Sequence, residues 1–419
     1  MSTANPTPRA ALWALGVLTA INLINYLDRY VVSAIVPDLK RAMALSDTQL
    51  GWLVPAFMLV YMIAAPAFGA WGDRGSRTRP IALGVLVWSL ATVLSGLARN
   101  YPQLLAGRAV VGIGEAAYVA IAPALLADCF TLEARGRMYA VLNMAIPVGA
   151  ALGYIVGGLM SAHFGWRAAF LAAGVPGLLL ALTVLRLPDP PRGSQERRVA
   201  PGRGAAAAGA SPLAVYVGLL RRWPFMVVVL GYAAYTFGLG GLAFWMPTFL
   251  ERVRHVPHAE ATTGFGAIVI VTGFLGTFLG GWLGDYFQRR RRQAYLWFSG
   301  LITLLAAPCA LLALLGATPA LYYPGIVLAE LLLFMSTGPI NAAIVNIATP
   351  LERASAVALS MFAIHLLGDV PSPLLIGWVS DLSSLGGAVL IVPVAVAVAG
   401  VVWLVAARVN SRAGELRAA

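Results

Sequence analysis

Residues 11–37 read ALWALGVLTAINLINYLDRYVVSAIVP, an apolar run interrupted only by the adjacent charges of Asp28 and Arg29. At about 1.5 Å per residue, the run is long enough to cross a bilayer core of about 30 Å as a helix. An ionised residue at the centre of such a helix costs about 2.5 to 3.5 kcal/mol, so membrane proteins keep it mainly for function. The stretch therefore predicts a membrane-spanning helix and favours transport. The alternative is that both charges neutralise partners inside a helix bundle and lock it.

The composition extends this reading to the whole chain. Hydrophobic residues make up 60% and charged residues 11%, with a mean hydropathy of +0.81, against about 45 to 50% and about 25% in soluble domains. A chain of 419 residues has room for about twelve spans of roughly 20 residues. We expect them at residues 11–36, 48–72, 79–98, 102–129, 136–162, 166–187, 223–249, 260–287, 293–316, 320–348, 354–380 and 387–408. Two cysteines, Cys129 and Cys309, predict neither a disulfide framework nor a metal site.

Basic residues fall unevenly on the two sides of these spans. Of 29 Lys and Arg, two lie inside spans, six lie in loops on one side, and the remaining 21 lie on the side shared by both termini. Because positive loops stay in the cytoplasm, both termini are expected there. The same bias accounts for the net charge of +12 without a nucleic-acid partner. The first span is too long and too charged for a cleavable signal peptide and is expected to remain in the protein.

The chain reads as two halves, residues 1–187 and 212–419, joined by a flexible cytoplasmic linker at 188–211 that is rich in Pro, Gly, Ala and Arg. The halves share a phrase after their second spans, GAWGDRGSRTR from Gly69 and GWLGDYFQRRR from Gly281. A repeat of six spans predicts two similar six-helix bundles around a midplane site, as in secondary transporters.

The first copy of this phrase resembles the GxxxDRxGRR signature of the major facilitator superfamily, and the resemblance covers essentially the whole chain. The matching positions are Gly69, Asp73, Arg74 and Arg77. Ser76 stands where the family usually has Gly, and Thr78 where it has a basic residue. We expect the phrase to gate the conformational change: its glycines let helices pack closely, and Asp73 pairs with a helix N-terminus of the other bundle. Asp285 and Asp369 are assigned to gating as well.

Further motifs narrow the family. NYLDR at residues 25–29, VGIGEA at 111–116, HLLGDVPSP at 365–373 and GWVSD at 377–381 together resemble the spinster group of facilitators, here a bacterial member. NYxDR alone also resembles organic anion:cation symporters. GAALGYIVGG at 149–158 resembles an antiporter motif, with Tyr154 in place of Pro, and favours export. The spinster resemblance implies an amphiphilic substrate, such as a lysophospholipid or a sphingosine-phosphate-like molecule, and proton coupling.

The charges suggest a mechanism. Neighbouring residues on a helix diverge by about 100°, so Asp28 and Arg29 should find partners on other helices. Arg108 and Glu115 are seven residues apart on one face of the fourth span and are the expected partners. We expect Asp28 and Glu115 to compete for Arg29 and to couple transport to protons, because protonation loosens the cluster and shifts the conformational balance. The candidate substrate-binding residues are Arg29, Arg108, Glu115, Tyr118, Asn143, Tyr232, Tyr235, Asn341 and His365.

Other classes fit less well. A membrane lipid hydrolase would need a nucleophile, a base and an oxyanion site, and the chain has no GxSxG or HExxH motif. Buried titratable groups in a two-bundle repeat suit alternating access better than a fixed pore. The alternative within transport is a proton-coupled facilitator for small organic anions or drugs. We expect a monomer in the bacterial inner membrane, with no cofactor and no metal. His255 and His258, in an external loop, are expected to bind nothing.

Overall fold

A computed structural model describes residues 7–193, 195, 212–291, 293–349 and 352–418. Every regular element in these ranges is helical, and twelve stretches are long and apolar enough to cross a membrane. Apart from the first, which runs on to Met43, their bounds lie within a few residues of the expected spans, so the all-helical, twelve-span prediction is confirmed. Chain contacts divide the protein into two compact units, which are described one at a time.

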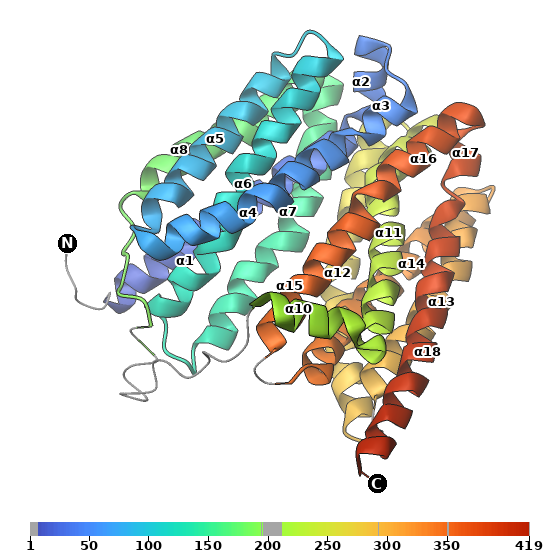
Figure 1. Ribbon diagram of the computed structural model, residues 1–419. Coiled ribbons are helices and arrows are strands. Elements are labelled where there is room, and N and C mark those ends of the chain that lie inside the picture. Colours follow the sequence, from blue (N-terminus) through green and yellow to red (C-terminus); the bar gives the residue numbers. More distant parts are fainter. Residues whose placement is uncertain (1–6, 194, 196–211, 292, 350–351, 419) are drawn as a thin grey trace. The chain divides into compact units, whose positions relative to one another are not determined.

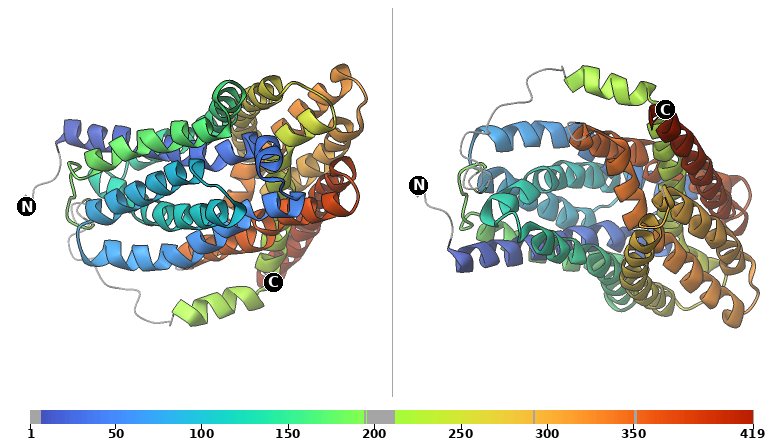
Figure 2. Two further views of the ribbon diagram at one scale, coloured as in Figure 1. Left: turned by 90° about the horizontal axis from the view of Figure 1, so that it is seen from above. Right: turned by 90° about the horizontal axis from the view of Figure 1, so that it is seen from below.

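The first unit contains the N-terminal helices and the segment Leu250–Gly266. Its helices are α1 (Pro8–Ala34), α2 (Val36–Met43), α3 (Asp47–Gly51), α4 (Leu53–Arg74), α5 (Thr78–Gly96), α6 (Tyr101–Cys129), α7 (Arg135–Phe164) and α8 (Trp166–Val184) (Figure 1). Helix α1 packs along α7, α4 along α6, and α5 along both α6 and α8. Two further views (Figure 2) show these blue-to-green helices running alongside one another.

Polar residues set where several of these helices begin. The Asn100 side chain accepts a hydrogen bond from the backbone N–H of Gln103 and caps α6. Ser46 and Gln49 form a reciprocal capping box at the start of α3. Such caps satisfy backbone N–H groups that the first helical turn leaves unpaired. Helix α1 ends at Ala34, and helix α2 begins at Val36 with Pro37 in its first turn, a position at which proline is favoured.

Small residues allow α7 to approach α1 closely. A methyl group on Gly149 would lie 2.5 Å from the carbonyl oxygen of Leu23, and one on Gly153 would lie 2.7 Å from that of Leu27. Carbon atoms do not fit at such distances, so both positions require glycine. The glycines of GAALGYIVGG therefore let α7 pack closely against α1, the helix that carries Asp28 and Arg29.

The second unit comprises α10 (Pro212–Arg221), α11 (Trp223–Arg252), α12 (His258–Gln288), α13 (Ala294–Leu315), α14 (Pro319–Ile347), α15 (Arg353–Ile364), the π-helical turn η1 (His365–Asp369), α16 (Pro371–Leu382), α17 (Leu385–Ala388) and α18 (Ile391–Ala418), apart from the part of α11 and α12 in Leu250–Gly266. Helix α13 packs against α14 and α18. Residues His365–Asp369 form one wide turn in the eleventh span, and Pro371 starts the helix after it. The eleventh span is therefore interrupted by a π-helical turn just before Pro371, a feature that is common at functional sites.

The repeated phrase plays the same packing role in both units, through its second glycine. A methyl group on Gly72 would lie 2.8 Å from Ile121 of α6, and one on Gly284 would lie 2.8 Å from Pro339 of α14. At Gly69 the corresponding space is open. The prediction that Gly69 permits close helix packing is therefore wrong, because its missing side chain faces no neighbouring helix.

The start of the predicted linker is fixed on the first unit. Asp189 accepts hydrogen bonds from the backbone and side chain of Arg77, at 2.8 Å each. Arg192 donates to the carbonyl oxygens of Gly72 and Gly75, and Gly193 N–H donates to Asp128 Oδ1 at 2.9 Å. The expected flexibility therefore does not apply to residues 189–193. Residues 194 and 196–211 of the predicted linker lie outside the described residues.

Candidate functional site

Four charged side chains meet inside the first unit, between α1 and α6. Arg29 Nε lies 2.7 Å from Glu115 Oε2, and Arg108 Nη1 lies 3.5 Å from Asp28 Oδ1. Glu115 is 0% exposed and Asp28 is 1% exposed, while the Arg29 side chain is 16% exposed. The structure thus brings together the four residues proposed from sequence. In this state Glu115 holds Arg29 and Asp28 holds Arg108.

A neutral residue completes the environment of Asp28. The hydroxyl of Thr92, on α5, donates a hydrogen bond of 2.6 Å to Asp28 Oδ2. Each oxygen of this carboxylate therefore has its own partner, which compensates part of the cost of burying it. Thr92 could not be identified from sequence, because a single threonine in an apolar span gives no signal of its direction.

Aromatic rings surround the Arg29 guanidinium. Its central carbon lies 5.2 Å from the ring centroid of Tyr26, 4.9 Å from that of Phe57 and 5.3 Å from that of Tyr61. Rings at this distance attract a cation through their electron-rich faces. Phe57 and Tyr61 were also missed, although their i, i+4 spacing places both on one face of α4. The rings can hold Arg29 in place when its carboxylate partner is neutralised.

The cluster also contains buried polar atoms without a hydrogen-bond partner among the described residues. They are Glu115 Oε1, Arg108 Nε and both side-chain polar atoms of Asn25. Buried polar atoms are rarely left unpaired in proteins unless they serve a function or bind a small molecule. One oxygen of Glu115 is therefore bonded to Arg29, whereas the other accepts no hydrogen bond from the described residues.

The remaining sequence candidates in the first unit contribute differently. Tyr118, on α6, donates its hydroxyl hydrogen to the Leu18 carbonyl oxygen at 2.7 Å, so it ties α6 to α1. Asn143 is exposed on α7. Of these two, only Asn143 has a side chain that is accessible in this state.

The other candidates belong to the second unit and form two pairs. Asn341 Nδ2 lies 3.3 Å from the Tyr232 hydroxyl. His365 Nδ1 lies 2.8 Å from Asp369 Oδ2, across the π-helical turn. Tyr235 donates to the Leu333 carbonyl oxygen at 2.7 Å, which links α11 to α14. Both pairs are polar and include accessible side chains, whereas Tyr235 is buried and links two helices.

The gating candidates are centred on Arg77. Its guanidinium donates to Asp128 Oδ2 at 2.5 Å, to Asp189 Oδ1 at 2.8 Å and to the Pro190 carbonyl oxygen. Burial by itself lowers the pKa of Arg77, but the hydrogen bonds with Asp128 and Asp189 outweigh it and raise that pKa. The sequence analysis did not anticipate either aspartate as its partner.

The other loop candidates make fewer contacts. Asp73 and Arg74 are exposed. Asp285, the counterpart of Asp73 in the repeat, accepts a hydrogen bond of 2.7 Å from the Tyr295 hydroxyl. Pairing of Asp73 with a helix of the other bundle stays a prediction.

A second ionic network lies at the other end of the first unit. His258, the first residue of α12, has Nδ1 2.7 Å from Glu251 Oε2 and Nε2 3.5 Å from Asp38 Oδ2. Arg41 bridges the same two carboxylates, at 2.5 Å from Asp38 and 2.8 Å from Glu251. The fold brings α2 beside the His258 ring, so this side chain belongs to an ion-pair network within the unit; that it binds no ligand stays a prediction. His255 is exposed and has a positive φ of 56°.

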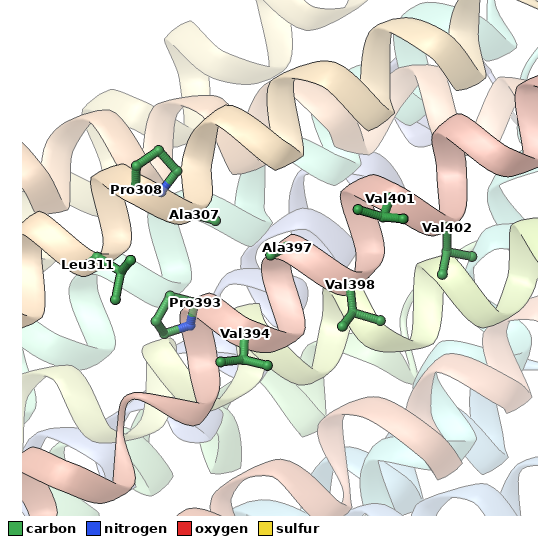
Figure 3. A pocket seen from close by; sticks show the side chains of 9 residues that line it. All are labelled: Ala307, Pro308, Leu311, Pro393, Val394, Ala397, Val398, Val401 and Val402. Atoms are coloured by element: carbon green, nitrogen blue, oxygen red, sulfur yellow. The ribbon is translucent and has the colours of Figure 1, made fainter.

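A cleft of about 490 Å³ lies between α13 and α18 in the second unit (Figure 3). All its lining residues are apolar: Ala307, Pro308, Leu311, Pro393, Val394, Ala397, Val398, Val401 and Val402. Several of them, such as Val394 at 62% and Val401 at 50%, are well exposed on the helix surface. The cleft therefore offers no polar side chain that could bind the head group of an amphiphilic molecule.

Comparison with known proteins identifies relatives over nearly the whole chain. The family model described as Major Facilitator Superfamily matches residues 18–370. Protein spinster homolog 3 of Danio rerio is 34% identical over 402 residues, covering 90% of this chain and 78% of that protein. Sphingosine-1-phosphate transporter SPNS2 of Xenopus tropicalis is 32% identical over 429 residues, covering 95% and 82%. The crystal structure of a bacterial homolog to the human lysosomal transporter Spinster, inward-facing and unoccupied, aligns over 96% of this chain and 98% of its own with a TM-score of 0.84 and 24% identity.

Proposed function

Because the chain belongs to the spinster family of the major facilitator superfamily, we propose that this transporter exports an amphiphilic lipid in exchange for protons. It is a multi-pass membrane protein and not an enzyme. A lysophospholipid or a sphingosine-phosphate-like molecule is the proposed substrate. One relative is named a sphingosine-1-phosphate transporter, and that name motivates the substrate class.

The observation that carries proton coupling is the pairing of Arg29 with Glu115 beside the pairing of Arg108 with Asp28. A proton on Glu115 removes the charge that holds Arg29, while the nearby rings keep the guanidinium in the cluster. Asp28 then becomes the remaining carboxylate for which both arginines compete. The free energy of the cluster thus depends on its protonation, and this dependence can shift the balance between two conformations.

Arg29 is the proposed head-group contact. A guanidinium binds phosphate or carboxylate through two parallel hydrogen bonds, and the 16% exposure of this side chain leaves it accessible. An anionic head group and a deprotonated Glu115 would compete for the same cation. Substrate and proton binding would therefore be linked through one residue.

The remaining assignments concern topology and assembly. The excess of Lys and Arg in the loops shared by the termini supports cytoplasmic termini in a bacterial inner membrane. We further propose that residues 1–187 and 212–419 act as the two moving bundles, that residues 188–211 join them, and that the protein works as a monomer.

Flux measurements in liposomes test this function. Labelled lysophospholipid uptake is compared with and without an imposed pH gradient for the wild type, Asp28→Asn and Glu115→Gln. Glu133→Gln, which removes an exposed carboxylate outside the spans, is the matched control. We expect gradient-stimulated flux in the wild type and control and its loss in both cluster variants. Flux that ignores the gradient and survives both changes would reduce the carboxylates to structural charges.

The same liposomes test the alternative substrate class. Small organic anions replace the lipid, and the gradient is kept. Gradient-driven anion flux without lipid flux would overturn the lipid assignment and leave proton coupling in place.

A further inference from the structure

Glu330 is a buried carboxyl group in the second unit that the mechanism above does not use. It lies in the middle of α14 and is 2% exposed. Among the described residues it has no ion-pair partner and no hydrogen bond. Asp28 and Glu115 are equally buried, but each of them has an arginine within 3.5 Å. Glu330 is therefore in a different electrostatic situation from the carboxylates of the first unit.

Within the described part of the chain, the helices that pack on α14 bring no cation within ion-pair distance of Glu330. Helix α13 packs along α14 and carries no charged residue. Helix α11 reaches α14 through Tyr235, whose hydroxyl donates to the Leu333 carbonyl oxygen and whose ring is the titratable group facing Glu330. Helix α12 meets α14 through Gly276 and Gly280 and is uncharged between them.

The last neighbour, α15, also leaves Glu330 unpaired. It has a single basic residue, Arg353, at its first position. Beyond it, Asp369 lies on the side of Tyr235 and is paired with His365, at 2.8 Å. Among the described residues, the Tyr235 phenol faces Glu330, and a phenol cannot neutralise an ionised carboxylate.

The internal repeat allows the height of Glu330 along α14 to be compared with the height of Glu115 along α6. Ile121 and Pro339 are equivalent positions, since each meets the second glycine of the repeated phrase in its own unit. Glu115 lies six residues before Ile121, and Glu330 lies nine residues before Pro339. The difference of three residues is about 4.5 Å along a helix. Glu330 therefore lies in its unit at nearly the depth that Glu115 occupies in the first.

We propose that Glu330 is a second proton-binding site, loaded in this conformation and separate from the Asp28–Glu115 cluster. A bare carboxylate without partners is strongly disfavoured in such surroundings, whereas the neutral acid is tolerated. With 2% exposure the carboxyl group is shielded from cations in solution, and one carboxylate cannot supply the ligand set of a metal ion. A proton needs neither space nor further ligands.

The transport role of Glu330 rests on the proposed function. In that role Glu330 must release its proton, which requires another conformation in which water reaches the carboxyl group. Proton occupancy itself can be measured without substrate. Infrared spectroscopy detects the carbonyl stretch of a protonated carboxylic acid, which an ionised carboxylate lacks. The measurement is made on the purified full-length protein in lipid, with Asp28→Asn and Glu115→Gln introduced together so that the cluster does not contribute.

We expect a protonated-acid band at about pH 7 in this background, and its loss on adding Glu330→Gln. Adding Glu133→Gln instead, which changes an exposed carboxylate, should leave the band unchanged. Glutamine resembles the neutral acid in shape and charge, so Glu330→Gln should stay folded, and an unchanged melting temperature in the otherwise native protein checks this. An identical band with and without Glu330→Gln, or no band at about pH 7, would overturn the proposal.

A second readout separates this site from the function as a whole. Protons moved per lipid are counted in liposomes for the native protein and for Glu330→Gln alone. A loss of about one proton per cycle supports a transport role. If the infrared band is present but the proton-to-lipid ratio is unchanged, Glu330 binds a proton that does not take part in transport, and the transport role is refuted. If neither protein transports lipid, the proposed lipid substrate is refuted instead.

Discussion

The ion pair between Arg29 and Glu115 should be stronger than the pair between Arg108 and Asp28. The first pair has a nitrogen–oxygen distance of 2.7 Å and the second 3.5 Å, and all four side chains are largely buried. Replacing Arg29 by Gln, Glu115 by Gln, and both together gives a double-mutant cycle that isolates the interaction between the two side chains.

The expected magnitude follows from the geometry. Two unit charges about 4 Å apart attract by about 4 kcal/mol at an effective dielectric constant of about 20. Removing one member of a buried pair costs about 3 to 5 kcal/mol, because the other charge stays behind unpaired. The double replacement removes both charges and should cost less than the sum of the single ones. We therefore expect a coupling energy of about 2 to 4 kcal/mol for Arg29 and Glu115.

The two single variants should differ. In Glu115→Gln, Arg29 keeps its contacts with the rings of Tyr26, Phe57 and Tyr61, which are worth about 0.5 to 2 kcal/mol. In Arg29→Gln, Glu115 is left fully buried without its hydrogen-bonded cation. Arg29→Gln should therefore be the more destabilising change.

Unfolding in mixed micelles provides the assay, followed through the fluorescence of the 11 tryptophans. The matched cycle of Asp28→Asn and Arg108→Gln is measured under the same conditions and should give the smaller coupling. A coupling below about 0.5 kcal/mol for Arg29 and Glu115 would refute the reasoning, since that value is typical of solvent-exposed pairs. A larger coupling for Asp28 and Arg108 would refute it as well.

Three further changes test contacts elsewhere in the chain. Gly153→Val should reduce the free energy of unfolding by about 1 to 3 kcal/mol, because the new side chain would collide with α1. The melting temperature and the lipid flux should both fall, and an unchanged melting temperature would contradict the packing described. His258→Ala should cost about 1.5 to 3 kcal/mol through its lost hydrogen bond to Glu251, and an equal loss in a Glu251→Gln background would exclude that contact as the cause. Hydrogen bonds from Arg222 lower the pKa of Glu352 from 4.5 to about 2, so the wild type should melt above Glu352→Gln near neutral pH. This advantage should fade as the pH falls from about 4.5 towards about 2, and a pH-independent difference would contradict it.

The spans and the family could be predicted from the sequence, because both depend on local patterns. A run of about 20 apolar residues is sufficient to define a helix in a membrane. The four charges of the cluster were equally visible, since each lies in an otherwise apolar span. That α1 and α6 bring Arg29 to Glu115 followed from the expectation that helix neighbours seek partners on other helices.

Contacts that depend on helix rotation could not be predicted. In a membrane helix the side facing lipid and the side facing protein are both apolar, so the pattern does not say where Thr92, Phe57 or Tyr61 points. The partners of Arg77 were hidden for another reason. Asp189 lies 112 residues further along the chain, in a stretch whose composition predicts only a flexible linker.

The two units share an architecture but not a charge pattern, and this asymmetry bears on how such a transporter could work. The second glycine of the repeated phrase packs in the same way on α6 and on α14. The first unit nevertheless places two arginines against two carboxylates, whereas α14 carries one carboxyl group with no cation. In the first unit an anionic head group can find a buried arginine within a span, while a proton can be held in either unit. Under the proposed function, the substrate and one proton would compete at Arg29 and Glu115, and a proton on Glu330 would respond to the conformation without competing for the substrate.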